Sequence, residues 1–297
     1  RIIREKGALR GCISTITDYG STLSLARESQ KLEGLDLAKK VTTTEVYSWE
    51  KGNEYRGFGR KIVKPVKKFH VVVYDFGVKR NILRILVDSG CLVTVVPCDM
   101  PARKVIELKP DGVFFSNGPG DPEPCDYAVE NVKFLADREY PIFGICLGHQ
   151  LLAETLGGKV GPSACPEIGV KEVSLTEIGI DGVFFDGVDE TLKCLQWHSA
   201  EVTKIPVGAE VLATSENCAV QALKWSTRAY SVQFHLEVEE DTVSNWSQIS
   251  EYDSALTREK GVGASDRLRK ECESEMASFN KNAERIYLNW MQTSAHI

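Results

Sequence analysis

A cysteine lies between two glycines where an apolar run meets a helical pattern. Residues 144–150 read Gly-Ile-Cys-Leu-Gly-His-Gln, with Cys146 near the centre. The apolar residues 141–143 precede this stretch, and apolar residues recur at helical spacing over 151–156. A strand, a sharp turn that carries a nucleophile and a helix together form a nucleophile elbow, in which hydrolases usually carry Ser. We predict that Cys146 is a catalytic nucleophile. The alternative is a small buried cysteine at a packed strand–helix corner.

The residues around Cys146 would also favour its chemistry. Glycine on either side leaves room where the turn is tight and the backbone is crowded. The N-terminal end of the following helix carries a partial positive charge, which favours thiolate over thiol. We therefore expect a nucleophilic sulfur at neutral pH.

A cysteine nucleophile needs a base, and the base needs a group that orients it. His235 and Glu237 are two residues apart in an apolar stretch, so on a strand they would point the same way. A carboxylate beside the imidazole would fix its tautomer and stabilise the imidazolium. We predict His235 as the base and Glu237 as its orienter. His198 is a rival base, but it has no acidic residue two positions on, so we expect it to line the pocket.

An acyl-transfer intermediate needs donors for its oxyanion. The backbone N–H of Leu147, directly after the nucleophile, is one candidate. The second is Gly118, in the turn 117–120 that reads Asn-Gly-Pro-Gly, where the main chain can approach a substrate closely. An ordinary turn between a strand and a helix is the alternative for 117–120.

The pattern of elements predicts an α/β fold with a doubly wound, mostly parallel sheet, in which ligands bind beyond the carboxyl ends of the strands. Strands are predicted at 70–74, 91–97, 112–116 and 141–145, and helices at 78–88, 102–108 and 126–136. The second half is richer in strands, predicted at 170–175, 194–197, 210–214, 219–225 and 229–234, before a long amphipathic helix over 266–291.

Residues 1–69 show little hydrophobic periodicity. They contain a predicted short helix at 35–40, a short strand at 46–49 and a lysine-rich linker at 61–68. We predict two units, 1–68 as the remnant of an N-terminal domain plus linker and 69–297 as the domain that carries the chemistry. Because the first residue is Arg, we expect that a segment precedes it in the whole protein.

Composition excludes several classes of function. The chain has 297 residues, 42% of them hydrophobic, and a net charge of −6, so nothing favours nucleic acid or an anionic membrane as a partner. No apolar run approaches the roughly 20 residues of a membrane span. Nine scattered cysteines without a CxxC pair are typical of a reducing cytosol, and they predict no metal site. No phosphate-binding or dinucleotide-binding glycine motif is present, so we expect no cofactor in this chain.

The elbow G-x-C-x-G-H-Q and the late F-H-x-E resemble the class I (triad) glutamine amidotransferases, whose domain has a flavodoxin-like fold. The first 160 residues are similar to the small chain of carbamoyl-phosphate synthetase, in the strings Arg4–Ala8, Asp36–Lys39, Tyr74–Arg84 and Ser116–Tyr127. The second half looks like stand-alone class I amidotransferase-like proteins, in Cys194–Val202, Ala219–Trp225, Tyr230–Val238 and the long terminal helix.

This resemblance implies a glutaminase. Cys146 would attack the side-chain amide of L-glutamine, and His235, oriented by Glu237, would protonate the leaving ammonia and then activate water. Gly118 and Leu147 would form the oxyanion hole. The resemblance implies that Gly118, Gly120 and Gln150 hold the substrate, beside Leu147. Trp197, His198 and Ser199 replace the family's glutamine-binding turn, and we predict that they also line the substrate pocket. In the family, ammonia passes through a tunnel to a synthetase large chain, and ATP and Mg²⁺ would belong to that partner.

Three hypotheses follow. The first is a glutaminase subunit that supplies carbamoyl phosphate synthesis. The second is a related amidohydrolase with another ammonia acceptor or a γ-glutamyl substrate. The third is a binding module that keeps the fold without turnover. The cysteine peptidases built on similar sheets fit the elbow and the late His-x-Glu less well.

Overall fold

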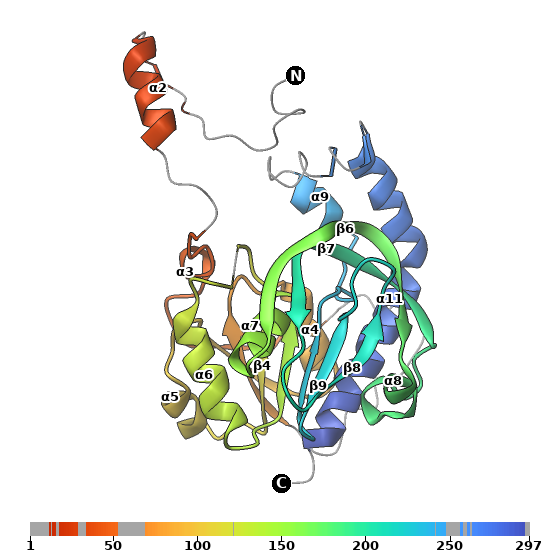
Figure 1. Ribbon diagram of the computed structural model, residues 1–297. Coiled ribbons are helices and arrows are strands. Elements are labelled where there is room, and N and C mark those ends of the chain that lie inside the picture. The colour runs from red at the N-terminus through yellow and green to blue at the C-terminus, as the bar shows by residue number, and fades with distance from the viewer. Residues whose placement is uncertain are drawn as a thin grey trace.

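The computed structural model describes most of the chain. Described are residues 12, 14–15, 18–28, 34–52, 69–120, 122–240, 242–247, 256–257, 260–261 and 263–294. A ten-stranded sheet runs through this part of the molecule in the order β1-β3-β2-β4-β5-β10-β9-β8-β6-β7 (Figure 1). The predicted linker at 61–68 and the string Arg4–Ala8 lie outside the described residues.

Five parallel strands form the part of the sheet that carries the elbow. They are β3 (Leu92–Pro97), β2 (His70–Asp75), β4 (Gly112–Phe115), β5 (Ile142–Ile145) and β10 (Ala229–Val232). The connecting helices are α4 (Arg80–Asp88), α5 (Ala102–Glu107), α6 (Asp126–Ala136) and α7 (Leu147–Thr155). Each predicted strand and helix between 70 and 145 is found within two residues of its expected bounds. The predicted α/β fold class is confirmed.

Helices cover both faces of these strands because successive strand residues point in opposite directions. On β2, Val71 and Val73 belong to one hydrophobic core, which also contains residues of α4. Val72 and Tyr74 belong to the other core, together with residues of α5, α6 and α7. Strands that are buried on both faces are almost continuously apolar, and this is why their sequence signal is strong.

The second half of the chain makes the sheet mixed by adding antiparallel strands. These are β9 (Ala222–Trp225), β8 (Ala209–Thr214), β6 (Lys159–Leu175) and β7 (Thr191–Lys204). β6 and β7 form a long ribbon that arches over the end of the sheet (Figure 1). Both strands are longer than predicted, and most of 159–166 is not buried, so an apolar pattern could not reveal it. Two short helices follow β6, α8 (Glu177–Asp181) and η1 (Val183–Phe185).

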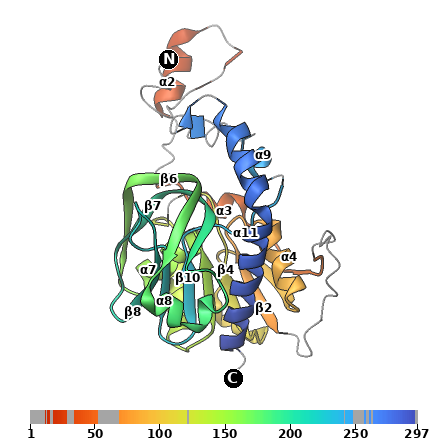
Figure 2. The same ribbon diagram turned by 90° about the vertical axis from the view of Figure 1, so that its right-hand side faces the viewer.

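The long helix α11 (Ala264–Ser294) runs along one face of the sheet (Figure 2). Trp290 is completely buried and packs edge-on against Phe114, while Tyr287 packs edge-on against Phe143. The helix α9 (Thr242–Ser247) lies near α11. Among the described residues, no helix has the length and apolar character that crossing a membrane requires.

The described residues before position 69 contribute two elements to the main body. They are α3 (Ala38–Val41) and β1 (Tyr47–Trp49), which pairs antiparallel with β3. A further helix, α2 (Tyr19–Glu28), has no buried residues and was not predicted. The predicted short helix at 35–40 and strand at 46–49 are thus present, and the domain boundary at 68 stays a prediction.

Gly148 sets the distance between α7 and β4. A Cβ atom at this position would lie 2.2 Å from the carbonyl oxygen of Phe115. We expect Gly148→Ala to lower the free energy of unfolding by about 1–3 kcal/mol, because backbone must shift to admit the methyl group. Thermal unfolding measures this. Gly161→Ala is the control, since its nearest neighbour is a side-chain methyl of Thr203 at 3.4 Å. Equal unfolding temperatures for the two variants would contradict the prediction.

Candidate active site

Cys146 occupies a strained turn between β5 and α7. Its backbone has φ 54° and ψ −104°, a region that residues other than glycine rarely adopt. The amide of Cys146 donates to the carbonyl oxygen of Val232 at 2.9 Å, which ties the turn to β10. A Cβ on Gly144 would lie 2.6 Å from the carbonyl oxygen of Gly148, so the crowding expected around the turn is present. This is the geometry of a nucleophile elbow.

The sulfur of Cys146 rests as a thiol, which corrects the expectation of a thiolate. Burial raises the pKa of the Cys146 thiol to about 11, although Lys79 and the backbone N–H of Leu147 pull the pKa down. The residue is only partly exposed, and the amide of Gln233 contacts Sγ at 3.7 Å. The N-terminal end of the helix therefore lowers the pKa of Cys146 as expected, but desolvation raises this pKa by more. A base must remove the thiol proton.

His235 and Glu237 lie beyond the end of β10, next to the elbow. β10 runs parallel to β5 with Val232 opposite Ile145, so both strands deliver their next residues to the same edge of the sheet. Nδ1 of His235 is hydrogen-bonded to Oε1 of Glu237, and both side chains are buried. The backbone of His235 is also paired with Leu195 of β7 through two hydrogen bonds of 2.9 Å.

The charges in this pair are suited to proton transfer. Burial lowers the pKa of His235, and Lys79 lowers it further against the opposing effect of Glu237, so the ring is neutral at neutral pH. Burial opposes the charge on Glu237, but Lys79 and His235 outweigh it and hold the pKa of the carboxyl well below its usual range. A neutral imidazole beside a carboxylate can accept a proton and stabilise it.

Lys79 contacts the predicted triad, although no local motif in the sequence marks it. Its Nζ lies 3.1 Å from Oε1 of Glu237. Lys79 directly precedes α4, and its backbone N–H donates to Oδ1 of Asn117 at 3.1 Å. The two residues of the ion pair are 158 positions apart, so no local pattern could have shown the contact.

The predicted oxyanion residues are neighbours. A Cβ on Gly118 would lie 2.8 Å from a side-chain methyl of Leu147 and 2.3 Å from the carbonyl oxygen of Phe76. Only glycine fits in this space. The loop is held by Ser116, whose hydroxyl accepts from the N–H of Phe76 at 3.0 Å. Gly120, with φ 93°, lies beside Leu37.

The other predicted substrate residues differ in burial and in position. Gln150 is buried next to the elbow, and its Nε2 donates to the carbonyl oxygen of Ala200 at 3.2 Å and to Oε1 of Gln233 at 3.1 Å. His198 is buried and its Nδ1 bonds to the same carbonyl at 3.0 Å. Trp197 is half-buried and Ser199 is exposed on β7. Gln150 and His198 thus meet at Ala200, and the binding roles stay a prediction.

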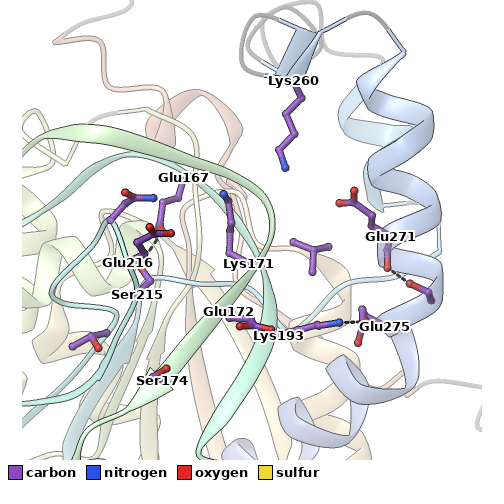
Figure 3. Close-up of a pocket in the computed structure, with 14 residues that line it drawn as sticks. Glu167, Lys171, Glu172, Ser174, Lys193, Ser215, Glu216, Lys260, Glu271 and Glu275 are labelled. Carbon is purple, nitrogen blue, oxygen red and sulfur yellow. Dashed lines mark hydrogen bonds and ion pairs between the residues drawn. The ribbon is translucent and has the colours of Figure 1, made fainter.

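A polar pocket of about 830 Å³ opens between β6, β7, β8 and α11 (Figure 3). Glu167 and Ser215 line it, whereas none of the predicted site residues does. Glu167 also belongs to a buried group with His198 and Cys218, whose potential metal-ligand atoms lie within 4.8 Å of one another. Each of the three already has protein partners, since Glu167 accepts from Ser215 and the Cys218 thiol contacts a carbonyl oxygen.

Comparison with known proteins places the chain among amidotransferases. The family profile described as glutamine amidotransferase class-I matches residues 72–245. The carbamoyl phosphate synthase small chain of Thioalkalivibrio sulfidiphilus is 52% identical over 160 residues, which are 54% of this chain and 42% of that protein. The small chain of Pasteurella multocida is 41% identical over 242 residues, 80% of this chain and 60% of that protein.

Two solved structures share the fold. A glutamine amidotransferase from Methylobacillus flagellatus has a TM-score of 0.64 at 22% identity, covering 77% of this chain and 96% of that one. A putative GMP synthase component from Thermoplasma acidophilum has a TM-score of 0.53 at 26% identity, covering 69% and 98%. The family match spans more than half of the chain and includes the elbow and the His235–Glu237 pair, so the chain belongs to the class-I glutamine amidotransferase family.

Proposed function

We propose that this chain hydrolyses L-glutamine to glutamate and ammonia through Cys146, His235 and Glu237. One observation carries the proposal. The strained cysteine turn after β5 and the hydrogen-bonded His–Glu pair after β10 lie at the same edge of neighbouring parallel strands. A thiol, a neutral imidazole and a carboxylate are the three groups that covalent amide hydrolysis needs.

The pKa directions give the order of proton transfers. His235 takes the Cys146 proton as the sulfur attacks the amide carbon, because thiol and imidazole are both neutral at rest. Glu237 stabilises the imidazolium, which then gives its proton to the departing ammonia. The N–H groups of Leu147 and Gly118 stabilise the developing oxyanion charge. Water activated by His235 releases glutamate in the second half of the cycle.

The ammonia is destined for carbamoyl phosphate synthesis, carried out by a synthetase large chain that binds ATP and Mg²⁺. The support is the 52% identity to small chains of carbamoyl phosphate synthase over more than half of this sequence. The chain spans less than half the length of these relatives, 42% in each case. The synthetase large chain as partner and L-glutamine as substrate are therefore both part of this proposal.

A second candidate is an amidotransferase with another ammonia acceptor. It is favoured by the solved structure of the putative GMP synthase component, which this chain covers over 98% of its length. Both candidates share the Cys146 chemistry, so they are separated by adding a carbamoyl-phosphate synthetase large chain with ATP and bicarbonate. Carbamoyl phosphate formed from glutamine supports the first candidate, and its absence beside full glutaminase activity supports the second.

Glutamate release from L-glutamine is the direct test. We expect the purified chain to turn over glutamine and Cys146→Ser to lose the activity by at least about a thousandfold, since the hydroxyl is a far weaker nucleophile in this setting. Cys165→Ser, which changes an exposed cysteine outside the site, is the control. Release that persists at the same rate in Cys146→Ser would refute the triad.

Glu237→Gln tests the role of the carboxylate. We expect kcat to fall by about a hundredfold or more, because the amide cannot stabilise the imidazolium. Glu239→Gln is a matched control two residues away, at a carboxylate that pairs with Arg84. Steady-state glutaminase kinetics measure both variants. A kcat for Glu237→Gln equal to that of the control would exclude Glu237 from the mechanism.

The raised pKa of Cys146 predicts the pH dependence of its alkylation. Only the thiolate reacts with iodoacetamide, so we expect the rate at Cys146 to rise about tenfold per pH unit from roughly pH 7 to pH 10. Peptide mass spectrometry of the quenched reaction separates Cys146 from the other cysteines. A rate that is already constant above neutral pH would show a resting thiolate instead.

A further inference from the structure

Glu167 begins a chain of hydrogen bonds that leads toward the nucleophile. It lies on β6 directly opposite His198 of β7, and Oε2 of Glu167 is 3.2 Å from Nε2 of His198. The other ring nitrogen, Nδ1, is 3.0 Å from the carbonyl oxygen of Ala200. A carbonyl oxygen only accepts, so Nδ1 carries a proton. A second proton must then lie between Nε2 and the carboxylate, because two lone pairs would repel at this distance.

The chain continues from Ala200 to the sulfur. Nε2 of Gln150 donates to the Ala200 carbonyl oxygen at 3.2 Å and to Oε1 of Gln233 at 3.1 Å. Nε2 of Gln233 in turn contacts Sγ of Cys146 at 3.7 Å. Both protons of the Gln150 amide nitrogen are thereby placed, which fixes the direction of the whole amide. Its carbonyl oxygen takes part in neither of these hydrogen bonds and remains available as an acceptor.

The protein holds Glu167 from its other side. Oε1 accepts from the Ser215 hydroxyl at 2.8 Å, and Oε2 accepts from Nε2 of Gln221 at 2.6 Å. The residue is 1% exposed, yet it lines the polar pocket of Figure 3, which none of the predicted substrate residues lines. A buried carboxylate with this many donors has one orientation available.

We propose that Glu167 is a positioning residue for substrate binding. By holding His198 it keeps the Ala200 carbonyl in place, and that carbonyl directs Gln150 toward the substrate. The inference deepens the proposed glutaminase function and rests on it. Without the carboxylate, the His198 ring keeps only its bond to the Ala200 carbonyl, so that carbonyl, which accepts from Gln150, is held less firmly.

Steady-state kinetics with three variants test the proposal. For Glu167→Leu we expect KM for glutamine to rise about tenfold while kcat stays within about threefold, since ground-state and transition-state binding are lost equally. Glu167→Gln retains an oxygen for His198 and an amide nitrogen for Ser215. Its KM for glutamine should therefore lie between those of the wild type and Glu167→Leu. Glu172→Gln, an exposed neighbour on the same strand and pocket wall, should match the wild type.

Thermal unfolding of each variant separates a loss of fold from a change in kinetics, and Glu167→Gln decides the question should Glu167→Leu not fold. A wild-type KM in both Glu167 variants would overturn the proposal. A fall in kcat with unchanged KM would also overturn it, because Glu167 would then act on the chemical step.

A second readout does not depend on glutamine hydrolysis. Nuclear magnetic resonance of ¹⁵N-histidine protein, with His198 assigned by His198→Gln, reports the protons on its ring. We expect the Nε2 signal of His198 to differ between the wild type and Glu167→Leu, because the carboxylate bonds to this nitrogen only in the wild type. If the wild type hydrolyses no glutamine, the proposed function fails, whereas the ring signals still decide whether Glu167 holds His198. Identical signals in both proteins would overturn the inference.

Metal analysis tests whether a bound zinc ion, and not a hydrogen bond, links Glu167 to His198. Glu167, His198 and Cys218 are side chains of the types that bind zinc, with ligand atoms within 4.8 Å of one another. We expect no stoichiometric zinc in the purified protein. One equivalent of zinc that is lost in Glu167→Leu would show that a metal, and not a proton, lies between Glu167 and His198.

Discussion

The parallel pairing of β5 with β10 is the constraint on which the rest of the site depends. A shift of one residue in this pairing would move His235 along the edge and turn its side chain to the other face of the sheet. The hydrogen bond from the Cys146 amide to Val232 fixes this register at the elbow, and the bridge between Leu195 and His235 holds the chain that follows β10. The sheet thus fixes the relative positions of two loops that carry the chemistry.

The charged side chains of the predicted site are buried, and they compensate one another. Glu237 is buried between an imidazole and the Lys79 ammonium, so protein groups compensate its negative charge. Removing one member of such a group leaves another charge buried and unpaired, which is costly. The same low-dielectric surroundings that make Cys146 a thiol also make the ion pair formed during proton transfer strong. Burial therefore keeps Cys146 protonated at rest and strengthens the ion pair that forms when its proton moves to His235.

The sequence predicted the first half of the domain well and the second half less completely. Strands such as 70–75 are buried on both faces, so their apolar runs identify them directly. The first half of β6 was missed because its side chains alternate irregularly and the pairing with β7 has two register shifts. Cys146, His235 and Glu237 could be predicted as site residues because each lies in a short local motif.

The remaining members of the site could not be found in this way, since they are defined by distant contacts. Lys79 acts through Glu237, and Glu167 through His198, its partner across β6 and β7. Gln233 could have been found from the pairing of Val232 with Ile145, which sets it beside Cys146. The thiolate expectation failed because a helix end is a local feature, whereas desolvation depends on everything packed around the sulfur.

The helix α11 is synthesised after all the strands that carry the predicted site. Phe279, Tyr287 and Trp290 belong to the core that underlies β4, β5 and β10, yet they follow β10 by more than forty residues. During synthesis at about 5–20 residues per second, the ribosome finishes the catalytic strands seconds before it delivers the helix that covers them. Over that interval no residue of α11 is available to cover the apolar underside of the elbow. Cys146, which packs against this core, therefore acquires its final surroundings only after the last turns of α11 are made.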